Sequence, residues 1–180
     1  MSVPYSLLVN SNASGVLVIP TEHYLASLRN YLVAAAAHEE AIPWDPDCTS
    51  NDAVLRDSIA NLARGKWAPV DSDAASSTHY FWYIIDDEIR GRCALRTEIR
   101  GSFGESHGNI GYDVHADFRG QGIATEMLRS LLDKARSLGM THVLITCDIS
   151  NVASRRVIEK CGGVMRDTFE ETYLRFDVNL

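Results

Sequence analysis

The chain has 180 residues, of which 46% are hydrophobic and 23% are charged, and these proportions exclude a globally disordered protein. Its formal net charge of −7, from 24 acidic and 17 basic residues, argues against nucleic acid or an anionic membrane as the main partner. No apolar run approaches the roughly 20 residues that span a bilayer, and no basic segment precedes an apolar core at the start. We therefore expect a cytoplasmic protein of one domain.

The four cysteines, Cys48, Cys93, Cys147 and Cys161, are widely spaced. None forms the close pairs that zinc sites or redox motifs use, so no metal is expected. We expect reduced thiols, with Cys147 and Cys161 packed as small hydrophobic side chains.

The first residues are expected to contribute little to the fold. Residues 1–14 are polar and unpatterned, so we expect them to be disordered or loosely attached. A single domain would then span residues 15–180, beginning with a strand over residues 15–19, GVLVI.

Two helices are predicted next. An apolar stripe after Pro20 predicts a helix to about Glu40, which the segment PWDPD then breaks. Asn51 or Asp52 can cap a second helix, and Gly65 would end it.

The middle of the chain predicts a hairpin between two loops. Residues 67–78 are rich in Asp, Ser and Ala and predict a loop. Residues 80–85 and 89–99 predict two strands joined by the acidic turn at 86–88. Residues 100–108, RGSFGESHG, are expected to form a glycine-rich connection long enough to overhang a site.

Residues 110–138 carry the strongest pattern in the chain. A short apolar run leads through Arg119, Gly120, Gln121 and Gly122 directly into a helix with one apolar face. The first N–H groups of a helix lack intrahelical partners and the helix dipole is positive there, so such a junction attracts phosphate. Glycines would let the backbone approach the anion without an intervening Cβ.

Three other interpretations of these residues compete with this phosphate site: a turn without a ligand, a Rossmann motif and a P-loop. A tight strand-to-helix turn without a ligand would also use these glycines. A Rossmann motif would need a third glycine where Thr125 stands, and no Gly-Lys-Ser/Thr of a P-loop follows.

The last part of the chain completes a mixed α/β sheet. Residues 142–147 predict a buried strand, and Asn151 begins a helix to about Lys160. Residues 164–169 and 173–178 predict the terminal strands.

The motif Arg119-x-x-Gly122-x-Ala124, placed between a strand and a helix, resembles a family motif. It is similar to the acetyl-CoA pyrophosphate loop of the GCN5-related N-acetyltransferases (GNATs), whose pattern is Gln/Arg-x-x-Gly-x-Gly/Ala. The segment 141–165 resembles the next strand and helix of that family, and the resemblance covers residues 79–178.

This resemblance implies a fold and a cosubstrate. Residues 15–180 would be a single N-acetyltransferase domain with the α/β GNAT fold, a central mixed, mostly antiparallel sheet with a splayed V-shaped opening and flanking helices. Acetyl-CoA would be the cosubstrate, with its pyrophosphate on the loop N–H groups, Arg119 fixing the loop, and its pantetheine arm on the strand before it. The residues that the resemblance implies for binding are Asp113, Val114, Arg119, Gly120, Gln121, Gly122, Ile123, Ala124, Thr125 and Asn151.

Acetyl transfer to an amine needs a base, because less than about 0.1% of an alkyl amine is neutral at pH 7. The candidates near the sheet edge are Glu98, Glu105, His107, Tyr112 and Asp113. Alternation along a strand puts Tyr112 and Asp113 on opposite faces. Glu98, His107 and Tyr112 are the predicted catalytic residues, and a solvated or structural role is the alternative for each.

One position departs from the family pattern. The tyrosine that often protonates the leaving thiolate in GNATs would stand where Ile158 stands here. The run Val157-Ile158-Glu159-Lys160 looks closer to the ribosomal-protein alanine acetyltransferase branch. Asn151 is expected to cap this helix and to touch the cofactor arm, or to act as a cap alone.

The resemblance thus implies an acetyl-CoA-dependent N-acetyltransferase that acetylates a primary amine by direct attack in a ternary complex. The acceptor would be an amine of a small molecule, a peptide or a protein. No nucleic acid and no membrane is expected as a partner, and the oligomeric state is left open between a monomer and a homodimer. A non-catalytic CoA-binding or regulatory module of the same fold is the alternative. A nucleotide-binding α/β enzyme such as a methyltransferase is a third hypothesis.

Overall fold

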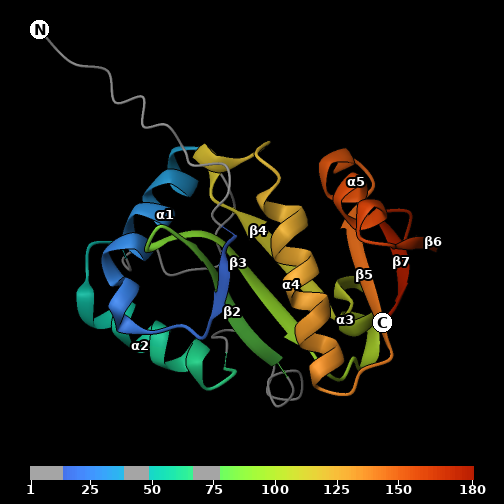
Figure 1. Ribbon diagram of the computed structural model, residues 1–180, viewed down its shortest axis with the longest axis horizontal. Coiled ribbons are helices and arrows are strands. Elements are labelled where there is room, and N and C mark those ends of the chain that lie inside the picture. The colour runs from blue at the N-terminus through green and yellow to red at the C-terminus, as the bar shows by residue number, and fades with distance from the viewer. Residues whose placement is uncertain (1–13, 39–48, 67–77) are drawn as a thin grey trace, which may run out of the picture.

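The computed structural model describes residues 14–38, 49–66 and 78–180 (Figure 1). The expectations for residues 1–13, for the break at residues 43–47 and for the loop over 67–77 fall outside the described residues. Among the described helices, none combines the length and apolar character needed to cross a membrane.

The centre of the fold is a seven-stranded sheet with the order β1-β2-β3-β4-β5-β7-β6. Neighbouring strands are antiparallel except β4 and β5, which are parallel, so the predicted mixed and mostly antiparallel sheet is confirmed. The strands are β1 (Val16–Val18), β2 (Thr78–Ile85), β3 (Glu88–Arg96), β4 (Ile110–Val114), β5 (His142–Asp148), β6 (Val164–Phe169) and β7 (Tyr173–Asn179).

Helices cover both faces of the sheet. They are α1 (Leu25–Ala37), α2 (Asp52–Ala63), α3 (Gly101–His107), α4 (Ile123–Ser137) and α5 (Val152–Lys160), with short 3₁₀ segments η1 (Glu22–Tyr24) and η4 (Ala116–Phe118). α4 and α5 cover one face, here called the α4–α5 face, and Figure 1 shows α4 running along the front of the sheet. α1, α2 and α3 cover the other, here called the α1–α3 face.

The helix that follows the glycine loop packs as its sequence predicts. Its apolar stripe is buried against the sheet, with Met127, Leu128 and Leu131 fully inaccessible to solvent, while Arg129 and Asp133 face outward. Burying side chains of this size contributes about 1.5–3 kcal/mol each. Gly139 follows the helix with a φ of 81°, the left-handed conformation expected of a residue that ends a helix.

The opposite face has its own hydrophobic cluster. Trp82 and Ile89 from the β2–β3 hairpin pack against Leu28, Leu32 and Leu55 of α1 and α2. The hairpin turns at Asp86 and Asp87, which have φ values of 51° and 61°, as a two-residue hairpin turn requires. Asn51 caps α2, since its side-chain oxygen accepts from the N–H groups of Ala53 (3.0 Å) and Val54 (3.4 Å).

β4 and β5 pair at one point only and then separate. The single pair is Ile110 with Ile145, although β4 continues to Val114 and β5 to Asp148. Asn109 fixes the point of contact, because its amide donates to the Arg96 carbonyl (2.8 Å) and accepts from the Leu144 N–H (2.7 Å). The predicted splayed opening of the sheet therefore begins at Ile110.

The connection over residues 100–108 is not an open loop, and that expectation was wrong. Residues Gly101–His107 form α3, which packs on the α1–α3 face of β5, where Thr146 Oγ1 donates to the Ser106 carbonyl (2.8 Å). Gly108 ends α3 with a φ of 60°, and a Cβ there would lie 2.5 Å from the Leu144 carbonyl oxygen. The glycine that suggested a loop instead allows a helix end to touch a strand.

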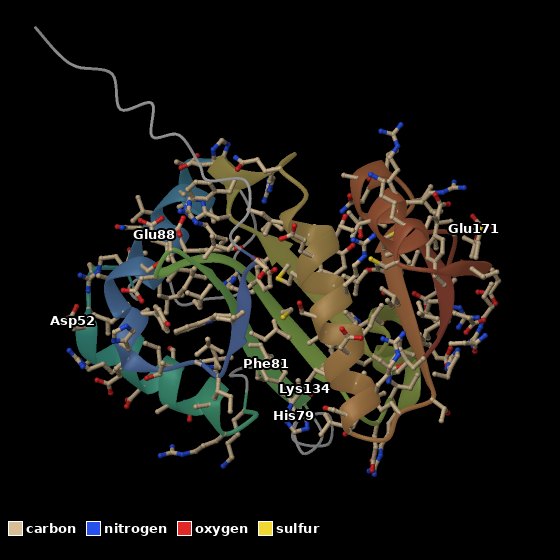
Figure 2. The ribbon with its side chains drawn as sticks, in the orientation of Figure 1. Asp52, His79, Phe81, Glu88, Lys134 and Glu171 are labelled. Carbon is tan, nitrogen blue, oxygen red and sulfur yellow. The ribbon has the colours of Figure 1, made fainter. Side chains whose placement is uncertain are left out.

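The charged side chains are spread around the periphery. Figure 2 shows Asp52 and Glu88 on the side of the molecule that carries α1 and α2, and Glu171 on the opposite side, in the turn between β6 and β7.

The cysteines of the described part, Cys93, Cys147 and Cys161, form no disulfide. Cys147 is buried as predicted, and Cys161 is half-buried.

Candidate active site

The junction between β4 and α4 is built by two glycines in the left-handed region. Gly120 has a φ of 76° and Gly122, the N-cap of α4, a φ of 87°. A Cβ at either position would meet no atom within 4 Å, so the backbone conformation, rather than lack of space, requires glycine here. The turn itself lies at the surface, whereas Ile123, the first residue of α4, is buried.

The N–H groups of this junction are open. No described residue accepts a hydrogen bond from the backbone N–H groups of residues 120–124. The first N–H group after the loop that has an acceptor is that of Thr125, which donates to the Gly122 carbonyl (2.9 Å). Gly120, Gln121 and Gly122 are exposed. Five successive donors at the positive end of a 15-residue helix form a site suited to a phosphate group.

Arg119 ties the loop to the strand before it. Its Nε donates to the carbonyl of Val114, the last residue of β4, at 3.1 Å. η4 adds a second constraint, because Asp117 lies 3.7 Å from His38 at the end of α1. These contacts hold the loop in place, whereas binding of a cosubstrate by Asp113, Val114, residues 119–125 and Asn151 stays a prediction.

Tyr112 and Asp113 point to opposite faces, as strand alternation predicted. Tyr112 lies on the α4–α5 face, where its hydroxyl is 2.9 Å from Ser154 Oγ and donates to the Ser154 carbonyl at 3.4 Å. It therefore bridges β4 and α5 across the opening of the sheet. Burial raises the pKa of Tyr112 to about 12, so the hydroxyl is protonated at pH 7 and acts as a donor.

Asp113 lies on the α1–α3 face in a network that ties α1 to the sheet. Arg92 donates to it twice, from Nε at 3.0 Å and from Nη2 at 3.1 Å, and the Tyr31 hydroxyl donates to the same carboxylate. Tyr31 is buried, and its burial, followed by the charge of Asp113, raises its pKa. Since the carboxylate already accepts three hydrogen bonds, Asp113 is a structural anion rather than a free base.

His107 is the base candidate with an available ring nitrogen. Its ring stacks on Phe103, with centroids 4.1 Å apart, and its Nδ1 lies 3.2 Å from the Phe103 carbonyl. Nδ1 also lies 2.8 Å from Ser106 Oγ, which can donate or accept. In the tautomer that donates from Nδ1 to the Phe103 carbonyl, Nε2 keeps its lone pair. Partial burial, followed by the nearby charge of Arg96, lowers the pKa of His107 below its usual 6.5.

The other two acidic candidates are placed less favourably. Glu98 follows the end of β3 and is exposed, with its carboxylate 2.5 Å from Arg100. Glu105 of α3 pairs with Arg175 of β7, which also binds Asp167. The structure therefore does not bring Glu98, His107 and Tyr112 together. Tyr112 faces α5, whereas Glu98 and His107 belong to the connection that leads into β4, near the point where β4 and β5 pair.

α5 is capped as expected and lacks a polar group at the family's tyrosine position. The Asn151 side chain accepts from the Ser154 N–H at 3.0 Å. Ile158 is fully buried in the core, and a Cβ at Gly163 would lie 2.4 Å from its side chain. The hydroxyl that reaches α5 comes from Tyr112 of β4 instead.

Sequence reasoning missed three residues that shape this region. Tyr31 appeared only as part of an apolar stripe, Asn109 was not singled out, and Arg96 was one charge among several. A polar residue between two strands was the only signal for Asn109. Within residues 14–38, 49–66 and 78–180, no group of three His, Cys, Asp or Glu side chains could hold a metal ion.

Comparisons with known proteins identify the family and the fold. The family model for the acetyltransferase (GNAT) domain matches residues 17–164. No curated protein sequence matches the chain.

Solved structures share the fold at low sequence identity. The microcin C7 self immunity acetyltransferase MccE, in complex with acetyl-CoA and AMP, has a TM-score of 0.68 at 15% identity, with 94% of each chain covered. The ribosomal-protein-S5-alanine acetyltransferase from Vibrio fischeri has a TM-score of 0.65 at 14% identity, covering 92% of this chain and 91% of the other. Aminoglycoside acetyltransferase AAC(6')-Ib, in complex with coenzyme A, has a TM-score of 0.62 at 19% identity, covering 92% and 95%.

Proposed function

Because the chain belongs to the GNAT acetyltransferase family, we propose that it transfers an acetyl group from acetyl-CoA to a primary amine within a ternary complex. The observation that carries this proposal is the βα junction at the end of the strand that separates from β5. Its residues 120–122 are exposed, and the N–H groups of residues 120–124 have no acceptor among the described residues. The acetyl-CoA and CoA complexes of structures with this fold support the choice of cosubstrate.

The loop and β4 would hold the donor. The N–H groups of residues 120–124 would bind the pyrophosphate, and Arg119 would keep the loop on the Val114 carbonyl. By the family resemblance, the β4 backbone at Asp113 and Val114, where β4 has separated from β5, would pair with the pantetheine arm. A backbone N–H at Val114 would also stabilise the negative charge that develops on the thioester oxygen during attack.

His107 is our choice of general base. Acetyl transfer forms a C–N bond, breaks the C–S bond and releases the amine proton, which Nε2 of a neutral His107 would accept through water. Its lowered pKa keeps it neutral at pH 7. Glu98 is less suited, because it is exposed and paired with Arg100.

Tyr112 would act on the leaving group as a hydrogen-bond donor. Its hydroxyl lies between β4 and α5, on the α4–α5 face where the loop begins α4. A phenol with a pKa of about 12 is a weaker acid than a thiol of pKa about 8.5, so it would stabilise the thiolate without giving up its proton.

The acceptor class is an amine on a small molecule, a peptide or a protein. The names of the similar structures include a ribosomal-protein-alanine acetyltransferase and an aminoglycoside acetyltransferase, which favours an amine acceptor over an alcohol. We propose that residues 15–180 form the catalytic domain and that the enzyme acts in the cytoplasm.

One observation favours a second candidate function. Ile158 occupies the family's tyrosine position and is fully buried, so no acid can act from there. A non-catalytic CoA-binding module of the same fold would tolerate this substitution.

Two measurements on one protein preparation separate the candidates. Calorimetric titration should show binding of acetyl-CoA, and thiol release in the presence of an amine panel should rise well above hydrolysis in its absence. Acetyl-CoA binding without accelerated thiol release for any amine would support the non-catalytic module. Absence of binding to both acetyl-CoA and CoA would contradict both candidates.

A further inference from the structure

We propose that Arg96 binds a carboxylate group on the α1–α3 face of the sheet, so that the acceptor is an amine that also carries a carboxylate. This inference deepens the proposed function and rests on it for the position of the reacting amine.

Arg96 is held over the main chain of β4. A Cβ built on Gly111 would lie 3.8 Å from Nη1 of Arg96 and 4.0 Å from its Nη2, so the guanidinium lies within contact distance of the side-chain face of Gly111. Nη1 donates to the Gly108 carbonyl at 3.2 Å, and the guanidinium carbon lies 5.4 Å from the centre of the Phe103 ring. The group is thus fixed, while no described residue accepts a hydrogen bond from its Nε or Nη2.

The charge of Arg96 has no counter-charge in the described chain. Arg92 pairs with Asp113, and Arg175 pairs with Asp167. In contrast, no described carboxylate lies within 4.0 Å of the Arg96 guanidinium. A partly buried cation without a partner is costly, and a bound anion would offset that cost.

The fork geometry of a guanidinium selects the class of anion. Two parallel N–H groups match a planar carboxylate, which an ammonium group would bind less specifically. Tyr80 of β2 lies close enough for electrostatic interaction with Arg96, and the exposed ring of His107 borders the same place. Gly111 is half-exposed, so this part of the sheet is open to solvent.

The position of the Arg96 guanidinium over β4 sets the distance between the proposed carboxylate site and the proposed reacting centre. Gly111 directly follows Ile110, at which β4 and β5 make their only pair, and lies two residues before Asp113. Two residues along a strand span about 7 Å. The carboxylate of Asp113 is on the same face and nearer to the proposed thioester, but Arg92 already pairs with it, so Arg96 supplies the uncompensated charge on this face. An acceptor whose carboxylate lies on Arg96 would extend its amine along β4 toward the proposed thioester.

Matched substrates test the proposal directly. We would measure thiol release with free L-amino acids and short acidic peptides, each paired with its carboxamide, on the parent, Arg96→Met and Arg96→Lys. Arg100→Met is the control, because Arg100 is an exposed arginine nearby. For the parent we expect KM to be at least about tenfold lower for the acid than for its amide. Arg96→Met should remove that preference by raising KM for the acid alone, and Arg96→Lys should keep part of it.

Calorimetry separates failure of this proposal from failure of the proposed function. The same acids and amides are titrated into CoA-saturated protein, so that no turnover is needed. If the parent binds the acid more tightly than the amide and Arg96→Met loses this preference, the carboxylate site is supported. If no thiol is released in the same experiments, only the enzyme assignment is contradicted. Equal KM and equal affinity for acid and amide, or an equal loss for both in Arg96→Met, would overturn the carboxylate site. Retained CoA binding in Arg96→Met excludes misfolding as the cause.

Discussion

Gly122 starts α4 in a conformation that L-residues rarely adopt, with a φ of 87°. Any side chain there costs about 1–2 kcal/mol of stability, although nothing lies within 4 Å of its Cβ. A substitution at this position therefore mixes backbone strain with whatever its side chain does to a ligand. A matched pair of variants is needed to separate the two effects.

Gly122→Asp should weaken acetyl-CoA binding at least about 100-fold, because it places a carboxylate against the pyrophosphate. Gly122→Asn has nearly the same shape and the same strain without the charge, so it should lose much less affinity. Gly139→Asp is a second control, since Gly139 has a φ of 81° with open space around it at the far end of α4. Equal affinities of Gly122→Asp and Gly122→Asn, measured by calorimetry, would contradict the loop assignment.

His107 should determine the acidic limb of the pH profile. The folded protein lowers its pKa, so the neutral base persists below pH 6.5, and kcat/KM should fall only when the pH drops through that lowered value. His107→Gln should reduce kcat by roughly 100-fold or more and remove this limb. Arg96→Met should move the limb to higher pH, because it removes a positive charge near the ring. A limb unchanged in His107→Gln would show that another group is the base.

At the scale of elements, Asn109 decides where β4 and β5 part. Its side chain joins β3 to β5 through the Arg96 carbonyl and the Leu144 N–H, while its backbone N–H donates to the Leu144 carbonyl at 2.7 Å. Asn109 is buried, so each of these groups depends on the amide for a partner.

Asn109→Ala should therefore lower the free energy of unfolding by about 2–4 kcal/mol, since it leaves two buried polar groups unsatisfied. Asn51→Ala, which removes only the exposed cap of α2, should cost about 1 kcal/mol. Urea unfolding followed by circular dichroism measures both. A loss for Asn109→Ala no greater than that for Asn51→Ala would mean that the amide does not hold the strands.

At the scale of the whole molecule, the sheet places the residues of the two proposed sites on opposite faces of β4. The α4–α5 face carries the glycine loop and Tyr112, and the α1–α3 face carries Asp113, Arg96 and His107. Donor and acceptor could then approach the reacting centre from opposite sides of one strand. The network of Tyr31, Asp113 and Arg92 links α1 to that strand.

Thermal unfolding should report which cofactor the fold accepts. Acetyl-CoA or CoA at 100 times its dissociation constant stabilises by about 2.7 kcal/mol, or roughly 5–10 °C in Tm for a chain of this size. S-adenosylmethionine and NAD should leave Tm unchanged. Stabilisation by either of these two and not by CoA would favour a different nucleotide-binding enzyme.

Local pattern was enough to predict most elements of the described chain. The stripe of α4, the Asn51 and Asn151 caps and the Asp86-Asp87 turn depend on residues close together in sequence, so short-range physics determines them. The glycine loop and the opposite orientations of Tyr112 and Asp113 follow from the same local rules.

Only the tertiary structure decided the rest. Residues 100–108 form α3 because β5 accepts the helix end at Gly108, a contact that no local pattern contains. Likewise, Arg96 becomes a candidate carboxylate site only because Gly111, Gly108 and Phe103 meet around it from other elements. Sequence determined which stretches fold and which loop suits a phosphate, since those depend on neighbours in the chain. Which side chains surround the acceptor depended on long-range packing, since strands distant in sequence bring them together.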